Sequence, residues 1–497
     1  MNKQFSRRDF LKMAGGAVAT VAGVRFLPQF LRKNLYPDEV VQAQTTDFDL
    51  FFAGTDGWFW LPEDSNSSLM PYFPDDLAPA PFNAYIFGFR NVTGMTDTQR
   101  QNQRNKAQHN APIFWVDEVT DDPLDTGSTQ GLRVQLTNLG LALRPDLTDA
   151  HTIHWHGFRN VIPYFDGEPS GSISVPVGQL FTYVYKPRDP GTYMWHCHVE
   201  DVEHVTMGMT SLVFVRPKQN QPNGADPAFA AGATDPWGGT LGSTVPPGKY
   251  AYNDYDGSTA YDREFALFLS EFWANGHWGD SHIQESQWYN FVADYSMLNG
   301  RVYPQTLLPN SPVNMSASAG PNAHALTIQC DGNGDMLSPI EDPNGASIPH
   351  PELQYNPHSS LITCNEGEKV LLRFANLGFR EAAMTLTGID LTVVGRDATI
   401  MRGRDGADTR YVTNTLLFGA GESFDAIFTA PAFTGGTDVD SQGRSYDKYI
   451  MYNRRYTQES NLVAGGGAGQ RTEVRVYQFG TLGTQQYINE HPDDTQV

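Results

Sequence analysis

The sequence predicts an all-β protein made of two β-sandwich domains. Short runs rich in Val, Ile, Leu, Phe, Tyr and Thr lie between clusters of Gly, Pro, Asn and Asp, for example at 132–136, 180–185 and 370–374, and this pattern is typical of strands joined by turns. No long segment has the 3.6-residue apolar period of a helix. The chain has 497 residues, which is too many for one sandwich, so we expect more than one domain.

A weak internal repeat sets the number of domains at two. Val134-Gln-Leu-Thr-Asn138-Leu-Gly140 is echoed by Leu372-Arg-Phe-Ala-Asn376-Leu-Gly378, and Gly178-Gln-Leu-Phe181 by Gly421-Glu-Ser-Phe424. Gly, Pro and Ala are frequent between the two copies, as in a linker or a long excursion. We therefore expect a first domain at 44–217, a linker or excursion at 218–262, a second domain at 263–480 and a C-terminal tail at 481–497.

The first residues resemble a twin-arginine export signal. Ser6-Arg7-Arg8-Asp9-Phe10-Leu11-Lys12 precedes an apolar run from Met13 to Val24, and Val41-Gln42-Ala43 offers a cleavage site. The run is shorter than the ~20 residues that a membrane-spanning helix needs, and a basic amphipathic anchor is the alternative reading. We expect residues 1–43 to be removed and the mature protein to be periplasmic or extracellular, with no integral membrane segment.

Charge and cysteine content narrow the possible partners. The formal net charge is −22, and it becomes more negative without the leader, so nucleic acid is excluded as a partner and the charge is read mainly as a solubility device. The chain has three cysteines. Outside the cell Cys330 and Cys364 could form a disulfide, and two free buried thiols are the alternative.

Two histidine clusters between residues 151 and 209 carry the chemistry. The first is His151-Thr-Ile-His154-Trp-His156, and the second is His196-Cys197-His198, followed by His204 and Met209. Side chains alternate between the two faces of a strand, so Cys197 lies on one face and its two histidine neighbours on the other. We expect the thiolate side to gather His151, Cys197, His204 and Met209, which is the ligand set of a blue-copper centre.

The opposite face offers a second copper site. His154, His156, His196 and His198 are its candidate ligands. Because His196 and His198 are bonded directly to Cys197, an electron on the first copper would have a short covalent path to the second.

These motifs resemble those of the multicopper oxidase family of cupredoxin proteins, which includes the laccases. The resemblance implies two cupredoxin-like Greek-key sandwiches and a copper-dependent oxidoreductase. Such an enzyme takes single electrons from a small-molecule or metal-ion donor at type 1 copper and reduces O2 at a type 2/type 3 site. It implies type 1 ligands at His151, Cys197, His204 and Met209, and type 2/type 3 ligands at His154, His156, His196 and His198. The loop from Cys197 to His204 is two residues longer than usual, and Met207 is a weaker axial candidate.

The second domain departs from that family. The repeat aligns Thr385 and Thr387 with His154 and His156, and Tyr452-Asn453-Arg454 with His196-Cys197-His198. Threonine is a poor copper ligand, so half of the expected histidines are missing. A neighbouring copy, a different protein or a site with fewer coppers could explain this. The candidates in a neighbouring copy are His277, His282, His324, His350 and His358, and we expect a homo-oligomer, such as a trimer.

Two other functions remain open at this stage. A copper nitrite reductase would use His156 and His196 with a third histidine from a neighbour, but that family has Asp where His154 stands and does not need His198. An electron carrier would leave the second site vestigial. Asp166 could deliver protons, although its Asp-Gly pair is more typical of a turn, and the natural electron donor is not specified by these motifs.

Overall fold

The computed structural model describes residues 49–63, 71–119, 131–220, 226–284, 286–311, 313–314, 323–325, 327–328, 350–455 and 469–494. The chain divides into two compact units, 1–47 and 48–497, and every described residue lies in the second. The predicted export signal, its cleavage site and Cys330 lie outside the described residues.

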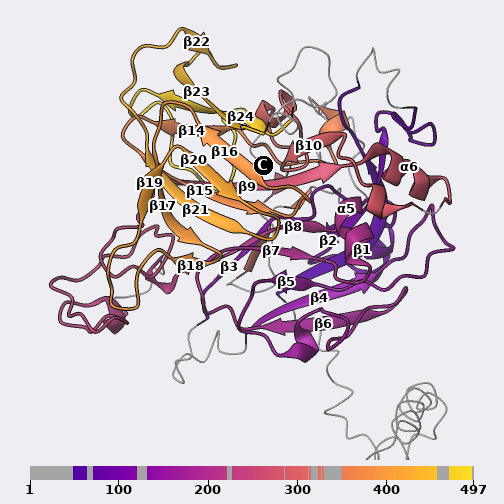
Figure 1. The fold of residues 1–497 in the computed structure, drawn as a ribbon, viewed down its shortest axis with the longest axis horizontal. Coiled ribbons are helices and arrows are strands. Elements are labelled where there is room, and N and C mark those ends of the chain that lie inside the picture. Colours follow the sequence, from indigo (N-terminus) through magenta and orange to yellow (C-terminus); the bar gives the residue numbers. More distant parts are fainter. Residues whose placement is uncertain are drawn as a thin grey trace, which may run out of the picture. The chain divides into compact units, whose positions relative to one another are not determined.

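The first sandwich is formed by two sheets (Figure 1). One sheet has the strand order β2-β1-β4-β6 and the other β12-β3-β8-β7-β5. Their strands are β1 (Leu50–Phe59), β2 (Ala84–Asn91), β3 (Phe114–Asp117), β4 (Leu132–Asn138), β5 (His154–His156), β6 (Leu180–Tyr185), β7 (Gly191–His196), β8 (Thr210–Arg216) and β12 (Ala323–Ala325). The inward side chains of both sheets form one apolar core that includes Trp155, Trp195 and Cys197. Alternation along the strands thus places the thiol inside the sandwich.

The second sandwich repeats this plan. Its two sheets have the orders β10-β9-β15-β21-β17-β18 and β14-β24-β23-β16-β20, with β19 beside β17 and β22 beside β23. The strands are β9 (Arg263–Phe272), β10 (Tyr295–Leu298), β14 (Ile362–Asn365), β15 (Lys369–Asn376), β16 (Ala382–Leu386), β17 (Leu391–Arg396), β18 (Thr399–Ile400), β19 (Tyr411–Thr413), β20 (Thr415–Phe418), β21 (Ser423–Thr429), β22 (Asp438–Val439), β23 (Ser445–Asn453) and β24 (Arg471–Tyr477). A separate buried apolar cluster fills this sandwich. The predicted all-β sandwich fold is confirmed.

The strand register reproduces the repeat seen in the sequence. In the first half β1 runs parallel to β4 with Gly54 opposite Asn138, and in the second β9 runs parallel to β15 with Leu269 opposite Asn376. His154 pairs with His196, as Thr385 pairs with Tyr452. The alignment of Thr385 with His154 therefore holds in three dimensions, whereas the exact domain boundaries stay a prediction.

The described helices are short. They are α4 (Asp97–Gln101), α5 (Asp201–Met207) and α6 (Ala274–Ser281), with single 3-10 turns η2 (Pro163–Phe165), η3 (Lys218–Asn220), η4 (Pro227–Phe229), η5 (Trp288–Asn290), η6 (Gln305–Leu307) and η7 (Pro351–Leu353). Both α5 and α6 pack against β2. Among the described residues no helix is both long and apolar enough to cross a membrane.

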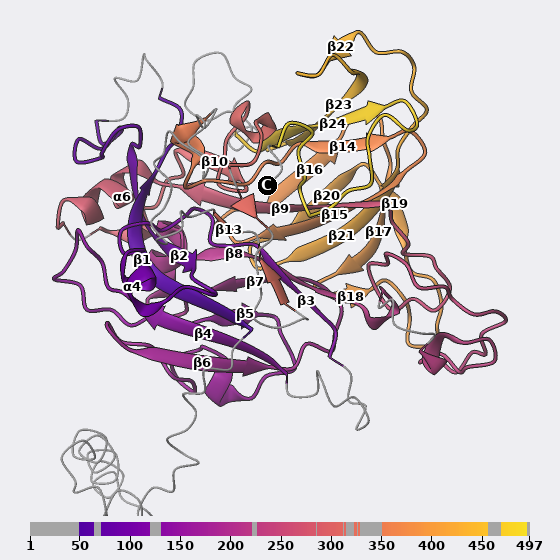
Figure 2. The ribbon, with the colours of Figure 1, turned by 180° about the vertical axis from the view of Figure 1, so that it is seen from behind.

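Three connections join the halves. Residues 226–261 form a lobe with its own small core beside β18 and β19 in both views (Figures 1 and 2), and Tyr252 from this lobe donates a hydrogen bond to Asp425 at 2.5 Å. Thr192 of β7 donates to the same carboxylate at 2.6 Å. Strand β12 comes from the second half of the sequence yet pairs with β3.

Candidate metal centre

The two histidine clusters meet because β5 and β7 are antiparallel neighbours. His154 lies directly opposite His196 across this pair. The strand β7 ends at His196, so Cys197 and His198 are the first two residues after it. The next segment forms α5, which carries His204, and Met209 immediately precedes β8.

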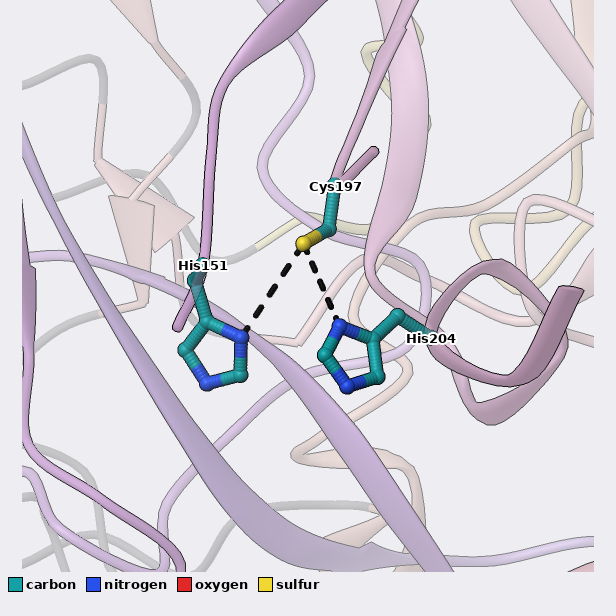
Figure 3. Close-up of side chains that lie close together, drawn as sticks. All are labelled: His151, Cys197 and His204. Carbon is teal, nitrogen blue, oxygen red and sulfur yellow. Dashed lines mark hydrogen bonds between the residues drawn. The ribbon is translucent and has the colours of Figure 1, made fainter. Parts of the chain in front are cut away.

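The thiol of Cys197 lies between two imidazoles (Figure 3). Its Sγ is 3.2 Å from His204 Nδ1 and 4.0 Å from His151 Nδ1. The backbone N–H of Thr152 also points at this sulfur, at 3.4 Å. The three side chains converge from a loop, a strand end and a helix, so one ion at their centre could bind all three.

Burial sets the protonation of this cluster. Cys197, His151 and His204 are almost fully buried. Desolvation raises the pKa of the Cys197 thiol to about 11 and lowers the pKa of His204 to about 4, and it lowers the pKa of His151 as well. The imidazoles are therefore neutral with lone pairs free to bind, and the thiol needs a cation beside it to ionise.

The methionine candidates are both buried, and a glycine makes room beside one of them. A Cβ built on Gly54 would lie 2.6 Å from His151 Cδ2 and 3.4 Å from Met209 Cε, so His151 and Met209 approach the same point of β1. Met209 accepts the backbone N–H of Cys197 at 3.0 Å through its carbonyl. Met207 lies in α5 and is also buried. Two imidazoles, a thiolate and a thioether suit copper.

The second cluster lies on the other side of the β5–β7 pair. His156 Nδ1 is 3.4 Å from His196 Nε2, and one ligand atom from each of His154, His156 and His196 falls within 4.8 Å of the others. The ring of His198 is 4.8 Å from that of His154, centroid to centroid. His196 is buried and the other three are half-buried, so an ion here could be reached from solvent.

Backbone groups orient two of these rings. His154 Nδ1 is 2.8 Å from the carbonyl of Asp166, and His196 Nδ1 is 2.7 Å from the carbonyl of Cys197. Both bonds direct Nε2 of the ring toward the other histidines of the cluster, and Nε2 of His196 lies 3.4 Å from His156 Nδ1. Asp166 ends the turn η2, and Gly167 follows with a φ of 78°, as an Asp-Gly turn requires.

The second half of the same chain lies against His156. A Cβ on Gly421 would be 3.2 Å from His156 Nε2. Burial lowers the pKa of His156, and the nearby carboxylate of Asp397 partly opposes this lowering. In the second half, Thr385 stands at the position that aligns with His154. Its hydroxyl forms a hydrogen bond with the hydroxyl of Thr415 at 2.9 Å. No described residue of the second half adds a histidine to this cluster.

Four of the five histidines that the sequence offered as ligands for a neighbouring copy contact other groups of this chain. His277 and His358 are buried, so the expectation that they could serve a neighbouring copy is wrong. His277 Nδ1 instead bonds the carbonyl of Tyr85 at 2.6 Å. His282 pairs with Asp76 at 2.9 Å, His350 with Glu352 at 3.1 Å, and His324 stacks on Trp115. Cys364 is buried, and Cys330, its expected disulfide partner, lies outside the described residues.

Sequence reasoning missed the roles of Gly54 and Thr152. A glycine inside a strand is a signal for close approach of another group, and Gly54 lies within the run Leu50–Phe59. Thr152 also accepts the backbone N–H of His198 through its hydroxyl at 2.9 Å. It therefore ties the first histidine loop to the His-Cys-His segment.

Known proteins resemble the part of the chain that carries the two histidine clusters. Residues 119–220 match the family model described as multicopper oxidase. Multicopper oxidase MCE of Talaromyces pinophilus is 35% identical over 74 residues, covering 14% of this chain and 12% of that protein. Ceruloplasmin of Rattus norvegicus is 31% identical over 106 residues, covering 20% and 9%. These matches confirm copper as the expected cofactor.

The similarity is local. The chain spans only 12% and 9% of the length of these two relatives. Among solved structures, the blue copper oxidase from Nitrosomonas europaea is 17% identical with a TM-score of 0.48, over 86% of this chain and 85% of that one. The family-model match over residues 119–220 supports the resemblance noted in the sequence for the ligand-bearing segment.

Proposed function

We propose that this chain is an exported multicopper oxidase-like oxidoreductase. It oxidises a reducing substrate by single electrons at a type 1 site and reduces O2 at a type 2/type 3 site. One observation carries the proposal: the thiol of Cys197 faces His151 and His204, while the ring of His196, bonded to it through one peptide, faces His154 and His156. Two metal sites that share one tripeptide suit a relay of electrons.

The proposed ligands are those that the sequence predicted. His151, Cys197, His204 and Met209 hold type 1 copper, and His154, His156, His196 and His198 hold the second site. Bound copper supplies the redox chemistry, accepting electrons one at a time and delivering them to oxygen.

The chain's own groups prepare both sites. The N–H of Thr152 supports the negative charge of the thiolate, and the surrounding aromatic core excludes water from it. The carbonyl of Asp166 fixes the ring of His154, and its carboxylate lies 3.6 Å from His154 Nδ1. The carboxylate of Asp166 therefore lies directly beside the second site.

Export and assembly belong to the same proposal. The twin-arginine pattern supports a periplasmic or extracellular location. The half-buried rings of His154 and His198 leave one side of the second site open, and we expect a second copy of the chain, in a homo-oligomer such as a trimer, to cover this side.

Oxygen uptake and nitrite loss, measured with one artificial electron donor, test this function. His154→Ala and His198→Ala should each abolish oxygen uptake and leave the blue absorption intact, because neither side chain faces Cys197. His282→Ala is the matched control, since His282 pairs with Asp76 instead, and it should keep full uptake.

Other outcomes would replace the proposal. Consumption of nitrite rather than oxygen, with a mild effect of His198→Ala, would identify a nitrite reductase. Electron exchange that survives all changes to His154, His156, His196 and His198 would identify a carrier.

A further inference from the structure

The hydroxyl of Thr152 lies at the junction of the two proposed copper sites. Thr152 follows His151 in the first histidine cluster, and it is fully buried. Its Oγ1 accepts the backbone N–H of His198 at 2.9 Å. Its own backbone N–H points at the sulfur of Cys197 at 3.4 Å. One residue therefore contacts both the thiol of the first site and the backbone of a candidate ligand of the second site.

The second half of the chain makes the corresponding bond in a different way. Ala383 and Arg454 stand at the positions that align with Thr152 and His198. The backbone N–H of Arg454 donates to the backbone carbonyl of Ala383 at 2.9 Å. In the first half, the acceptor of the matching N–H is a side-chain hydroxyl instead of a carbonyl. The strand framework alone therefore does not require a hydroxyl at this position.

A hydroxyl can do what a carbonyl cannot. A carbonyl oxygen only accepts hydrogen bonds, whereas a hydroxyl accepts with its lone pairs and donates its own proton at the same time. Burial raises the pKa of the Cys197 thiol, and hydrogen bonds from the backbone and from the side chain of Thr152 lower it. The sulfur thus has two donors from one residue, the N–H and the O–H of Thr152.

These donors act on the negative charge of the sulfur. In a copper–thiolate bond the sulfur carries more negative charge when the metal is reduced than when it is oxidised, so a donor beside it stabilises the reduced state more. Hydrogen bonding around the cysteine sulfur is one of the factors that set the reduction potential of a blue-copper centre. Removal of a donor should therefore lower this potential.

We propose that Thr152 is a positioning residue whose hydroxyl raises the reduction potential of the first copper site and couples that site to His198. This inference rests on the proposed function, because it needs a type 1 copper at Cys197. The hydroxyl holds the backbone of His198 through the bond that it accepts, and it supports the thiolate through the bond that it donates. A change in charge on the sulfur is therefore transmitted to the second site over two hydrogen bonds.

Thr152→Val tests the proposal, since valine keeps the branched shape and lacks the hydroxyl. The copper-loaded protein is titrated with redox mediators, and its blue absorption and copper–sulfur vibrations are recorded. At a fixed ambient potential we expect the ratio of reduced to oxidised type 1 copper to be about tenfold lower, which corresponds to a potential about 59 mV lower. The blue band and the copper–sulfur vibrations should shift, while the copper content stays unchanged.

Two further variants separate the hydroxyl from a loss of packing. Thr152→Ser keeps both hydrogen bonds and should have the potential and the blue band of the unaltered protein. Thr472→Val is the matched control, because it removes a buried hydroxyl of the second half that donates to the carbonyl of Ser360 at 2.7 Å. It should leave the potential and the blue band unchanged.

A second measurement needs no copper. Valine offers the backbone N–H of His198 no acceptor, so hydrogen exchange of this amide in the copper-free protein should be faster in Thr152→Val. In Thr152→Ser the exchange rate should equal that of the unaltered protein, because the acceptor is retained.

Three results would overturn the proposal. One is a blue Thr152→Val protein with an unchanged potential, which would leave the proposed function intact. Another is a potential in Thr152→Ser as low as that in Thr152→Val, and the third is equal exchange of the His198 amide in all three proteins. An unaltered protein that binds copper without any blue absorption would overturn the proposed function and this inference together.

Discussion

The two halves of the chain place different side chains on the same strand framework. In the first half the N–H of Thr152 points at Cys197 Sγ, at 3.4 Å. In the second half the N–H of Ala383 donates to Asn453 Oδ1, at 3.0 Å. Cys197 donates its own N–H to the carbonyl of Met209, as Asn453 does to that of Gln470, at 3.0 and 2.9 Å. The strand framework therefore provides the same backbone donors in the half with the candidate ligands and in the half without them.

The difference lies in how each buried side chain is satisfied. Asn453 Nδ2 donates to Gln470 Oε1 at 2.7 Å, so this amide pair is complete without a ligand. Cys197 Sγ lies near the N–H of Thr152, the carbonyl of Val199 and two neutral imidazoles, and burial raises the pKa of its thiol. A buried polar group must find a partner in the fold, and we infer that a bound cation would complete the Cys197 cluster of the first half.

The two halves also differ in the size of the side chain at one matching position, in β1 and in β9. Gly54 and Leu269 occupy the same register position in the two halves, opposite Asn138 and Asn376. Leu269 fills the second core, whereas Gly54 leaves that volume to His151 and Met209. In the first half this volume is therefore occupied by two of the proposed ligands instead of an apolar side chain.

The largest effect is expected at the thiolate. Cys197→Ser should abolish the intense blue absorption completely while the second site still takes up part of its copper, because only the first site loses its sulfur ligand. Visible absorption and copper content of the purified variant check this. Cys364→Ser, the same change at the other described cysteine, should stay as blue as the unaltered protein, and a blue Cys197→Ser protein would refute the ligand assignment.

A strong but incomplete effect is expected at Gly54. Gly54→Ala pushes a methyl group into His151, where the gap is only 2.6 Å, so the blue band should shift and weaken while copper at the second site is retained. Absorption and spin-resonance spectra measure the change.

The converse change tests the second half. Leu269→Ala leaves a cavity and should lower the free energy of unfolding by about 2–5 kcal/mol with no change in the blue band. A Gly54→Ala protein with an unaltered spectrum would show that the two positions do not differ in the way described.

The smallest effect concerns a histidine that is buried without being a ligand. Burial lowers the pKa of His358 to about 3, below its value in the unfolded chain, so the unfolded state binds more protons as the pH falls below about 6.5. Between pH 6.5 and pH 5, His358 therefore lowers the free energy of unfolding by about 2 kcal/mol. His358→Asn should lose this part of the pH dependence in urea unfolding curves measured at both pH values, and an unchanged slope would contradict it.

Local patterns made much of this structure predictable. The alternation of side chains in a strand was enough to put Cys197 and His196 on opposite faces, and the repeat was enough to pair Thr385 with Tyr452. Both inferences depend only on neighbours along the chain and on a shared strand plan.

Long-range packing could not be read in the same way. Nothing in the sequence near His156 indicates that Gly421 lies against it, and nothing near residue 323 indicates that β12 pairs with β3. The sequence offered His277 as a ligand for a neighbouring copy, but the fold buries it, and its Nδ1 bonds the carbonyl of Tyr85. Such contacts depend on how the two sandwiches pack together.

The central claim is that one half of the chain holds both copper sites through residues 196–198. The most direct test counts copper per chain in the purified protein and records its absorption and spin-resonance spectra. The account predicts an intense blue absorption together with more than one copper per chain. A protein that binds copper without blue absorption, or that binds a single blue copper alone, would contradict it.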